Sequence, residues 1–67
     1  MLRQYVNSSR ISSVGWWKDT LEVEFRDGAV YQYYNVSYNE YISFMGSSSL
    51  GHALSILDKN HRYSRVN

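Results

Sequence analysis

The clearest pattern of hydrophobic and polar positions lies between residues 20 and 26. Three apolar residues alternate there with three charged ones, the period of two that is typical of a strand with one buried and one wet face. The apolar positions are Leu21, Val23 and Phe25, and the charged ones are Glu22, Glu24 and Arg26. The alternation predicts a strand over residues 20–26 in which the two glutamates form a solvated face.

Another strand is predicted before it, over residues 10–17. This segment contains Ile11 and Val14, followed by Gly15 and two tryptophans, and β-branched and aromatic residues favour strands. A glycine inside a strand often marks a bulge, so we expect the strand to bend or bulge at Gly15. The Lys-Asp-Thr sequence of residues 18–20 then predicts a turn.

The sequence Arg-Asp-Gly at residues 26–28 predicts a hairpin to a third strand that ends at Tyr34. A two-residue loop would place Val30 on the core face, whereas a three-residue loop with Gly28 at positive φ would place Tyr31 and Tyr33 there. We favour the three-residue loop because it puts two aromatic rings in the core. It leaves Val30 and Tyr34 partly exposed on the outer face.

Two short helices follow. Ser37 and Glu40 have the spacing of a capping box, which predicts a helix that starts here and stops at Gly46. Three serines at residues 47–49 precede the second helix, which should fray near Asn60. The expected buried stripes are Tyr38, Tyr41, Ile42 and Met45 on the first helix, and Leu50, Ala53, Leu54 and Leu57 on the second.

The two ends of the chain lack a clear period. Residues 1–7 are expected to form a flexible arm or a short edge segment, and the residues after the second helix a short extended segment. The predicted fold is therefore α+β: a three-stranded antiparallel meander followed by two short helices and a short C-terminal extended segment, within one domain at residues 8–67.

Composition limits the function classes. The 67 residues include no cysteine, so neither a disulfide framework nor a thiolate zinc site is available. The N-terminus lacks the apolar region of a signal peptide, and no segment approaches the roughly 20 apolar residues that cross a bilayer. We therefore expect a cytoplasmic protein without membrane association.

Several short sequences, in order, resemble the KTSC domain over roughly residues 8 to 66. They are Ser8-Ser9, Ile11, Val14-Gly15-Trp16, Thr20 to Phe25, Val30 to Tyr33, Ser49, Gly51, and Tyr63 to Val66. Tyr31 and Tyr33 match the Tyr-x-Tyr hallmark of that family, which is named after a C-terminal extension of some lysyl-tRNA synthetases. Members also occur as free-standing small bacterial and phage proteins, which this chain resembles in length. The resemblance implies RNA binding, although Leu50 stands where the family usually has a lysine.

Charge is distributed unevenly, although the net charge is only +1. Residues 1–18 carry three cations and no acid, residues 41–67 carry three cations and one acid, and the middle segment is acidic. If the two ends meet, they form one basic face, where cations and aromatic rings suit phosphates and stacked bases. The predicted nucleic-acid-binding residues are Arg10, Trp17, Lys18, His61, Arg62, Tyr63 and Arg65. The alternative is a set of solvated charges, with Trp17 packed over the terminal segment.

The start of the second helix is another candidate site. Ser48, Ser49 and Gly51 would present free backbone amides to an anion such as phosphate, at the positive end of the helix dipole. The alternative is that Ser49 or Ser48 simply caps its own helix. Tyr31 and Tyr33 are interpreted as core residues rather than as a platform for stacking bases.

No arrangement of residues predicts catalysis. His52 and Asp58 could join a serine in a triad, but they are six residues apart on one helix, so their side chains diverge. Two histidines without a close carboxylate motif predict no metal site, and no cofactor is expected. We therefore predict a non-catalytic binding module for RNA or a nucleotide. The alternative is a protein-interaction or self-associating module, for example a phage or bacterial accessory protein that binds a host protein.

Overall fold

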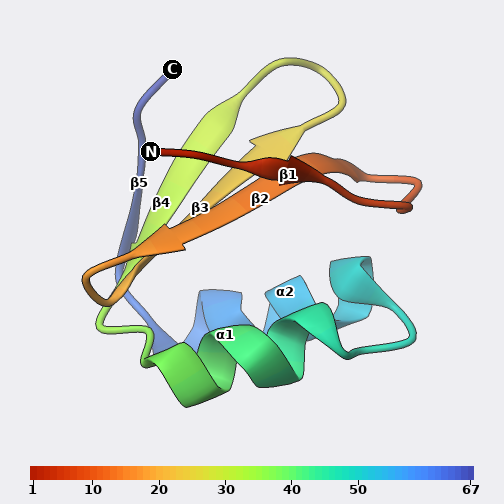
Figure 1. Ribbon diagram of the computed structural model, residues 1–67. Coiled ribbons are helices and arrows are strands. Elements are labelled where there is room, and N and C mark those ends of the chain that lie inside the picture. Colours follow the sequence, from red (N-terminus) through yellow and green to blue (C-terminus); the bar gives the residue numbers. More distant parts are fainter.

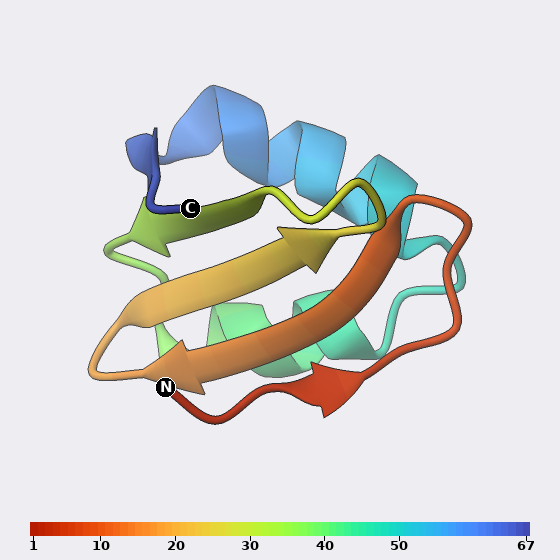
Figure 2. The same cartoon turned by 90° about the horizontal axis from the view of Figure 1, so that it is seen from above.

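The computed structural model describes residues 1–67 and has two layers, a five-stranded antiparallel sheet and two helices on one of its faces (Figure 1). The strands lie in the sheet in chain order, and Figure 2 shows α1 on the β2 side and α2 on the β4 side. Neither helix is long and apolar enough to span a membrane. The elements are β1 (Gln4–Tyr5), β2 (Ile11–Trp17), β3 (Thr20–Phe25), β4 (Val30–Tyr34), α1 (Tyr38–Met45), α2 (Leu50–Asn60) and β5 (Tyr63–Arg65).

The predicted α+β class, the meander and both helices are confirmed, but the sheet has five strands instead of three. The expected C-terminal extended segment is β5, which pairs with β4. Within residues 1–7, the edge-segment alternative is the one observed, because Gln4 and Tyr5 pair with Val14 and Ser13 of β2. Each terminal segment therefore forms one edge of the sheet.

A turn joins β2 to β3, as expected, but it comprises only residues 18 and 19, because Thr20 already belongs to β3. Lys18 and Asp19 both have positive φ, 47° and 63°, the left-handed conformation at both central positions that suits the twist of a hairpin. The bulge expected at Gly15 is wrong, because the register shift lies between Ile11 and Ser13. Gly15 instead allows a close approach of the N-terminal segment, since a Cβ atom there would overlap the Leu2 carbonyl oxygen.

The hairpin between β3 and β4 has the favoured three-residue loop. Gly28 has a φ of 93°, and its amide donates to the Phe25 carbonyl oxygen. The Phe25 amide donates to the Ala29 carbonyl oxygen and closes the loop. Val23 consequently pairs with Tyr31. The expected exposure of Val30 is wrong, since only 5% of it is exposed. The chain continues past β5, and the backbone of its last two residues hydrogen-bonds to Val30.

Local signals start both helices. Ser37 Oγ accepts from the Glu40 amide at 3.1 Å, and Glu40 Oε1 accepts from the Ser37 amide at 3.2 Å, which is the predicted capping box. Ser49 Oγ accepts from the His52 amide at 3.3 Å and caps α2.

The core lies between the sheet and the helices, and α1 faces it differently than expected. The stripe predicted for α1 is partly wrong, because Tyr38 and Ile42 are 56% and 48% exposed, whereas Phe44 is buried. Residues 41, 44 and 45 also have helical spacing, so the period alone fits either face. The buried cluster comprises Ile11, Val14, Leu21, Val23, Tyr33, Val36, Phe44, Leu54 and Leu57.

The outer face of β3 is less exposed to solvent than predicted. Glu22 is only 7% exposed, because Arg3 from the N-terminal segment donates to its carboxylate through Nη1. Gln32 donates to the other carboxylate oxygen at 2.8 Å. Burial alone would raise the pKa of Glu22, but the hydrogen bonds from Gln32 and Arg3, with the charge of Arg3, hold that pKa below its usual value.

Candidate functional site

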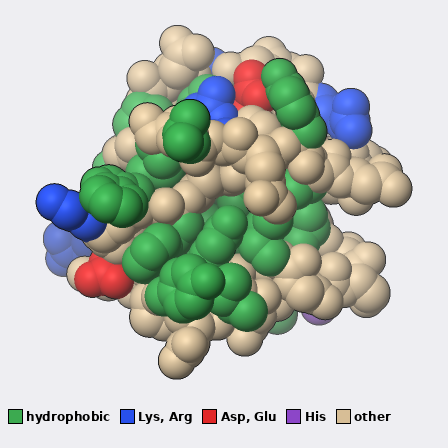
Figure 3. Space-filling view, viewed as in Figure 1, with side chains coloured by type: hydrophobic (Ala, Val, Ile, Leu, Met, Phe, Trp, Pro, Cys, Tyr) green, Lys and Arg blue, Asp and Glu red, His purple; other side chains and the backbone are tan.

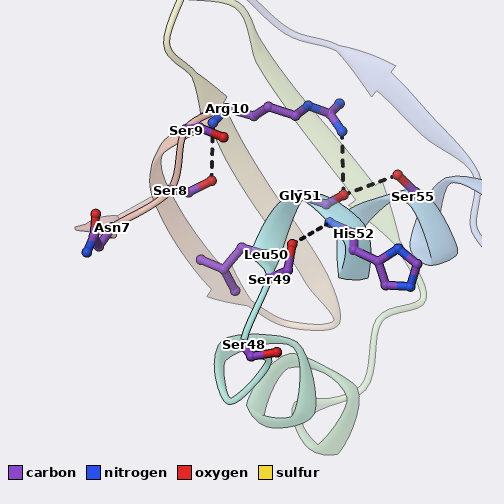
Figure 4. Close-up of a pocket in the computed structure, with 10 residues that line it drawn as sticks. All are labelled: Asn7, Ser8, Ser9, Arg10, Ser48, Ser49, Leu50, Gly51, His52 and Ser55. Atoms are coloured by element: carbon purple, nitrogen blue, oxygen red, sulfur yellow. Dashed lines mark hydrogen bonds between the residues drawn. The ribbon is translucent and has the colours of Figure 1, made fainter.

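A polar pocket of about 450 Å³ lies between the β1–β2 loop and the start of α2 (Figure 4). Leu50 is the one hydrophobic residue among its ten lining residues, and the pocket contains no carboxylate. Its lining residues are Asn7, Ser8, Ser9, Arg10, Ser48, Ser49, Leu50, Gly51, His52 and Ser55. The structure thus brings one of the predicted nucleic-acid-binding residues together with all three predicted anion-binding residues.

Arg10 is held over the pocket by groups on two other elements. Its guanidinium carbon lies 5.9 Å from the centre of the Phe25 ring, and Nη1 donates to the Gly51 carbonyl oxygen at 3.4 Å. A Cβ atom at position 51 would lie 3.4 Å from Arg10 Cδ, an ordinary van der Waals distance, so the Arg10 side chain packs closely against the first turn of α2. No carboxylate pairs with Arg10, so most of its donors remain available to an anion.

The loop that carries Arg10 is fixed by hydrogen bonds of its own. Ser8 Oγ accepts from the amides of Arg10 and Ile11, each at 3.2 Å. Arg26, beyond the end of β3, donates through Nε to the Ser8 carbonyl oxygen at 2.8 Å. These bonds fix the loop relative to the sheet and so set the distance between Arg10 and α2.

The first turn of α2 supplies backbone donors to the same pocket. Ser49 caps the helix, as its alternative interpretation required, and thereby satisfies the His52 amide. The amides of Leu50 and Gly51 have no acceptor within the chain, as is usual for the first amides of a helix. The cap and an anion site are therefore compatible here, because the cap uses only one of the free donors.

Two other predicted residues lie at the opposite end of β2. Trp17 is 62% exposed, and Lys18 Nζ lies 5.6 Å from the centre of its ring. Arg10 precedes β2, whereas Trp17 ends it and Lys18 follows it, so the length of the strand separates the two groups. The polar pocket has no contribution from Trp17 or Lys18.

The four predicted nucleic-acid-binding residues at positions 61 to 65 lie in or next to β5, at the edge of the sheet opposite β1, and their environments differ from one another. His61 Nε2 lies 2.8 Å from Glu40 Oε2, and Nδ1 lies 2.9 Å from the Tyr34 carbonyl oxygen, so both ring nitrogens are used within the fold. Arg62 is exposed. Tyr63 and Arg65 line a second cavity on the helix side of β4 and β5. The seven predicted nucleic-acid-binding residues thus do not share one surface.

Six of the ten residues that line the polar pocket were not predicted to belong to a binding site. They are Asn7, Ser8, Ser9, Leu50, His52 and Ser55. The two serines at 8 and 9 carried a signal, because they were part of the KTSC resemblance. Nothing in the local sequence indicated that their loop would face α2. Tyr33 is a core residue, as expected, and Tyr31 is half-buried.

Comparison with known proteins identifies the family. The KTSC domain matches residues 7–63, most of the chain. The chain belongs to the KTSC domain family. The crystal structure of a KTSC domain protein from Yersinia pestis is similar to this fold, with a TM-score of 0.91 and 32% sequence identity. That match covers 98% of this chain and 97% of the other. No curated protein matches this KTSC chain.

Proposed function

We propose that this KTSC domain is a non-catalytic module that binds RNA or a nucleotide by holding a phosphate group in the polar pocket. The observation that carries the proposal is the position of Arg10. Its guanidinium has no acidic partner and contacts the Gly51 carbonyl oxygen in the first turn of α2, the turn in which the amides of Leu50 and Gly51 have no acceptor. A cation and free backbone amides in one pocket are complementary to phosphate.

Two features of the pocket lining support this ligand class. The serine hydroxyls of the pocket add neutral donors, and the absence of any carboxylate from its lining removes repulsion toward an anion. The KTSC resemblance implies RNA as the source of the phosphate, through the C-terminal extension of some lysyl-tRNA synthetases after which the family is named. His52 is the one imidazole in the pocket, and no acid is present there to orient it, which supports a binding role over catalysis.

The experiment is an NMR titration of the ¹⁵N-labelled chain with a single-stranded RNA octamer and, separately, with inorganic phosphate. We expect saturable shifts in the amides of residues 7–10 and 48–52. Binding of RNA should weaken as salt rises, because phosphate contacts release counterions. RNA that produces no saturable shifts, or shifts confined to residues 16–18 and 61–65, would contradict the proposed site.

A matched pair of variants tests the role of Arg10. Arg10→Gln removes one cation from the pocket, and it should weaken RNA binding about 10- to 100-fold, the loss expected for one charge-assisted hydrogen bond. It should also lower the salt dependence, with the slope of log K against log salt falling by about 0.7 for a single strand. Lys59→Gln removes the same charge from the exposed last turn of α2. Equal effects of the two variants would show a general charge effect and no phosphate site at Arg10.

A second candidate function, protein interaction or self-association, is favoured by the exposed face of the helices. Tyr38, Ile42 and Ile56 are each about half exposed. Figure 3 shows hydrophobic side chains gathered at the surface on the side where α1 meets the sheet. Such surfaces mark contact sites in soluble proteins. Sedimentation at micromolar concentration tests association: an Ile42→Lys variant should lower the apparent mass if copies associate through α1, and a monomer at all concentrations counts against self-association.

A further inference from the structure

A second cavity, of about 320 Å³, lies on the helix side of β4 and β5 and has a different chemistry from the polar pocket. Aromatic rings and two carboxylates dominate its lining. The lining residues are Phe25, Asp27, Ala29, Tyr31, Tyr33, Asp58, Tyr63 and Arg65. Phe25 separates the two sites, because Arg10 lies over its ring while Tyr31 packs against it on the side of the second cavity.

The rings form a continuous row across three strands. The centroids of Phe25 and Tyr31 are 5.6 Å apart, those of Tyr31 and Tyr63 are 5.9 Å apart, and those of Tyr63 and Tyr33 are 5.2 Å apart. Tyr33 is buried, whereas Tyr63 is half exposed and Tyr31 half-buried. The row therefore presents partly accessible ring surface to the cavity while its inner end is fixed in the core.

Two carboxylates without ion-pair partners lie beside this row of rings. Asp58 Oδ1 accepts from the Tyr33 hydroxyl at 2.7 Å, and Asp27 Oδ1 accepts from the Ala29 amide at 3.0 Å. Neither residue is in an ion pair, and each has a second oxygen without a hydrogen bond inside the chain. Burial, with the hydrogen bond to Asp58 and its charge, raises the pKa of Tyr33, which keeps its hydroxyl a neutral donor.

Arg65 is the one cation that lines the cavity. Its Nε donates to the Asn67 carbonyl oxygen at 3.0 Å, and it pairs with neither Asp27 nor Asp58. Two carboxylates and one guanidinium leave the lining with a net negative charge. This charge disfavours a phosphate here, although sequence analysis placed Tyr63 and Arg65 in a nucleic-acid surface.

We propose that this cavity binds an organic cation, an alkylammonium or alkylguanidinium group, between the rings of Tyr31 and Tyr63 and the carboxylates of Asp27 and Asp58. The faces of aromatic rings attract such cations through the ring quadrupole, and the effect grows as the cation loses water. The free carboxylate oxygens supply charge-assisted acceptors for its N–H groups. The site is independent of the phosphate pocket proposed above, because the two share no lining residue.

The experiment titrates the labelled chain with butylguanidinium, and in a second arm with a blocked Gly-Arg-Gly peptide, while the ring and amide resonances of residues 31, 58 and 63 are followed. Butylurea, an uncharged analogue of similar shape, is the control ligand. We expect saturable shifts with at least one of the two cations and none with butylurea. Binding of the free cation alone identifies a small-molecule ligand, and binding of the peptide identifies a basic side chain of a partner. The proposal is overturned if neither cation binds or if butylurea binds equally well.

Three variants test the chemistry of the cavity. Asp58→Asn retains an acceptor for Tyr33 but removes the charge, and it should weaken cation binding about tenfold. Asp19→Asn makes the same change on the exposed β2–β3 turn, where its positive φ suits asparagine, and should leave binding unchanged. Arg65→Gln should strengthen cation binding because it removes a competing charge. A weaker affinity of the Arg65→Gln variant would refute the assignment, and an unperturbed spectrum of each free variant establishes that it is folded.

Discussion

Replacing Arg3 with alanine tests how the N-terminal segment is held on the sheet. The Arg3 side chain makes two hydrogen bonds across the outer face, from Nε to Ser13 Oγ at 2.9 Å and from Nη1 to the Glu22 carboxylate. The variant removes both donors and leaves the Glu22 carboxylate without its cation. Because only 9% of the Glu22 side chain is exposed, water cannot fully replace the lost partner.

The magnitude follows from how far the pair is buried. Breaking a fully buried ion pair costs about 3–5 kcal/mol, and losing a hydrogen bond to a charged group costs about 1.5–3 kcal/mol. The Arg3 side chain is 28% exposed and Glu22 retains the hydrogen bond from Gln32. The expected loss is therefore that of a hydrogen bond to a charged group, not that of a fully buried ion pair. We therefore expect Arg3→Ala to lower the free energy of unfolding by about 1.5–3 kcal/mol at neutral pH.

The dependence on pH gives this prediction a signature. The folded-state pKa of Glu22 lies below its usual value of 4.5, so the stability contributed by its carboxylate is present above pH 4.5. That contribution is lost as the pH falls through the lower folded-state value. The difference between the wild type and Arg3→Ala should therefore be largest near neutral pH and shrink below pH 4.5. The pKa of Glu40 is also lowered, mainly by the hydrogen bond from the Ser37 backbone, but Glu40 contributes equally to both proteins.

Urea unfolding of both proteins between pH 3 and pH 7 provides the measurement, with Arg62→Ala as the control for truncating an exposed arginine. Glu22→Gln in the Arg3→Ala background should restore part of the lost stability, because it removes the unpaired charge. A loss below about 0.5 kcal/mol, the usual range for a surface substitution, or a loss that does not change with pH, would refute the reasoning.

Two further predictions concern backbone geometry and helix capping. Gly15→Ala should displace the N-terminal segment, because its Cβ atom would meet the Leu2 carbonyl oxygen, and hydrogen exchange should show faster exchange of the Val6 amide, which bonds to β2. Gly28→Ala is the matched control: nothing lies within 4 Å of its Cβ position, so it should cost about 1–2 kcal/mol through positive φ alone and leave Val6 protected. Ser37→Ala should lower the free energy of unfolding by about 1 kcal/mol in urea titrations, because α1 loses its cap; no change would show that the capping box does not stabilise the fold.

The parts of the fold that local chemistry determines were predictable. The alternation in β3, the loop at Gly28 and the capping box at Ser37 each depend on residues a few positions apart. The orientation of α1 was not, because Ile42 and Phe44 both satisfy a helical period, and only the position of the sheet selects between them. The burial of Glu22 likewise depends on Arg3, which is distant in the chain and belongs to a segment without a period.

The candidate site was predictable in its parts but not as an assembly. The serines and glycine at the start of α2 were identified from capping chemistry, and Arg10 was identified from charge. Their proximity is a tertiary contact between a loop and a helix, and no spacing in the sequence encodes it. The second cavity, here called the aromatic cavity, was not predicted. Tyr33 was correctly interpreted as a core residue, but its position in the core does not indicate that Tyr31 and Tyr63 extend the same row of rings toward the surface.

The position of β5 has a consequence for the order of folding. Strands β1 to β4 pair with their neighbours in the chain, but β5 reaches β4 only after both helices have been traversed. Contacts between near neighbours in sequence form at a lower entropic cost, so we expect the meander to nucleate the fold and β5 to join last. The same three-residue strand should be the first to detach, leaving Tyr31 and Tyr33 on an open strand edge. The aromatic cavity would then exist only in the fully folded chain, whereas Arg10 and α2 would retain their contact during such openings.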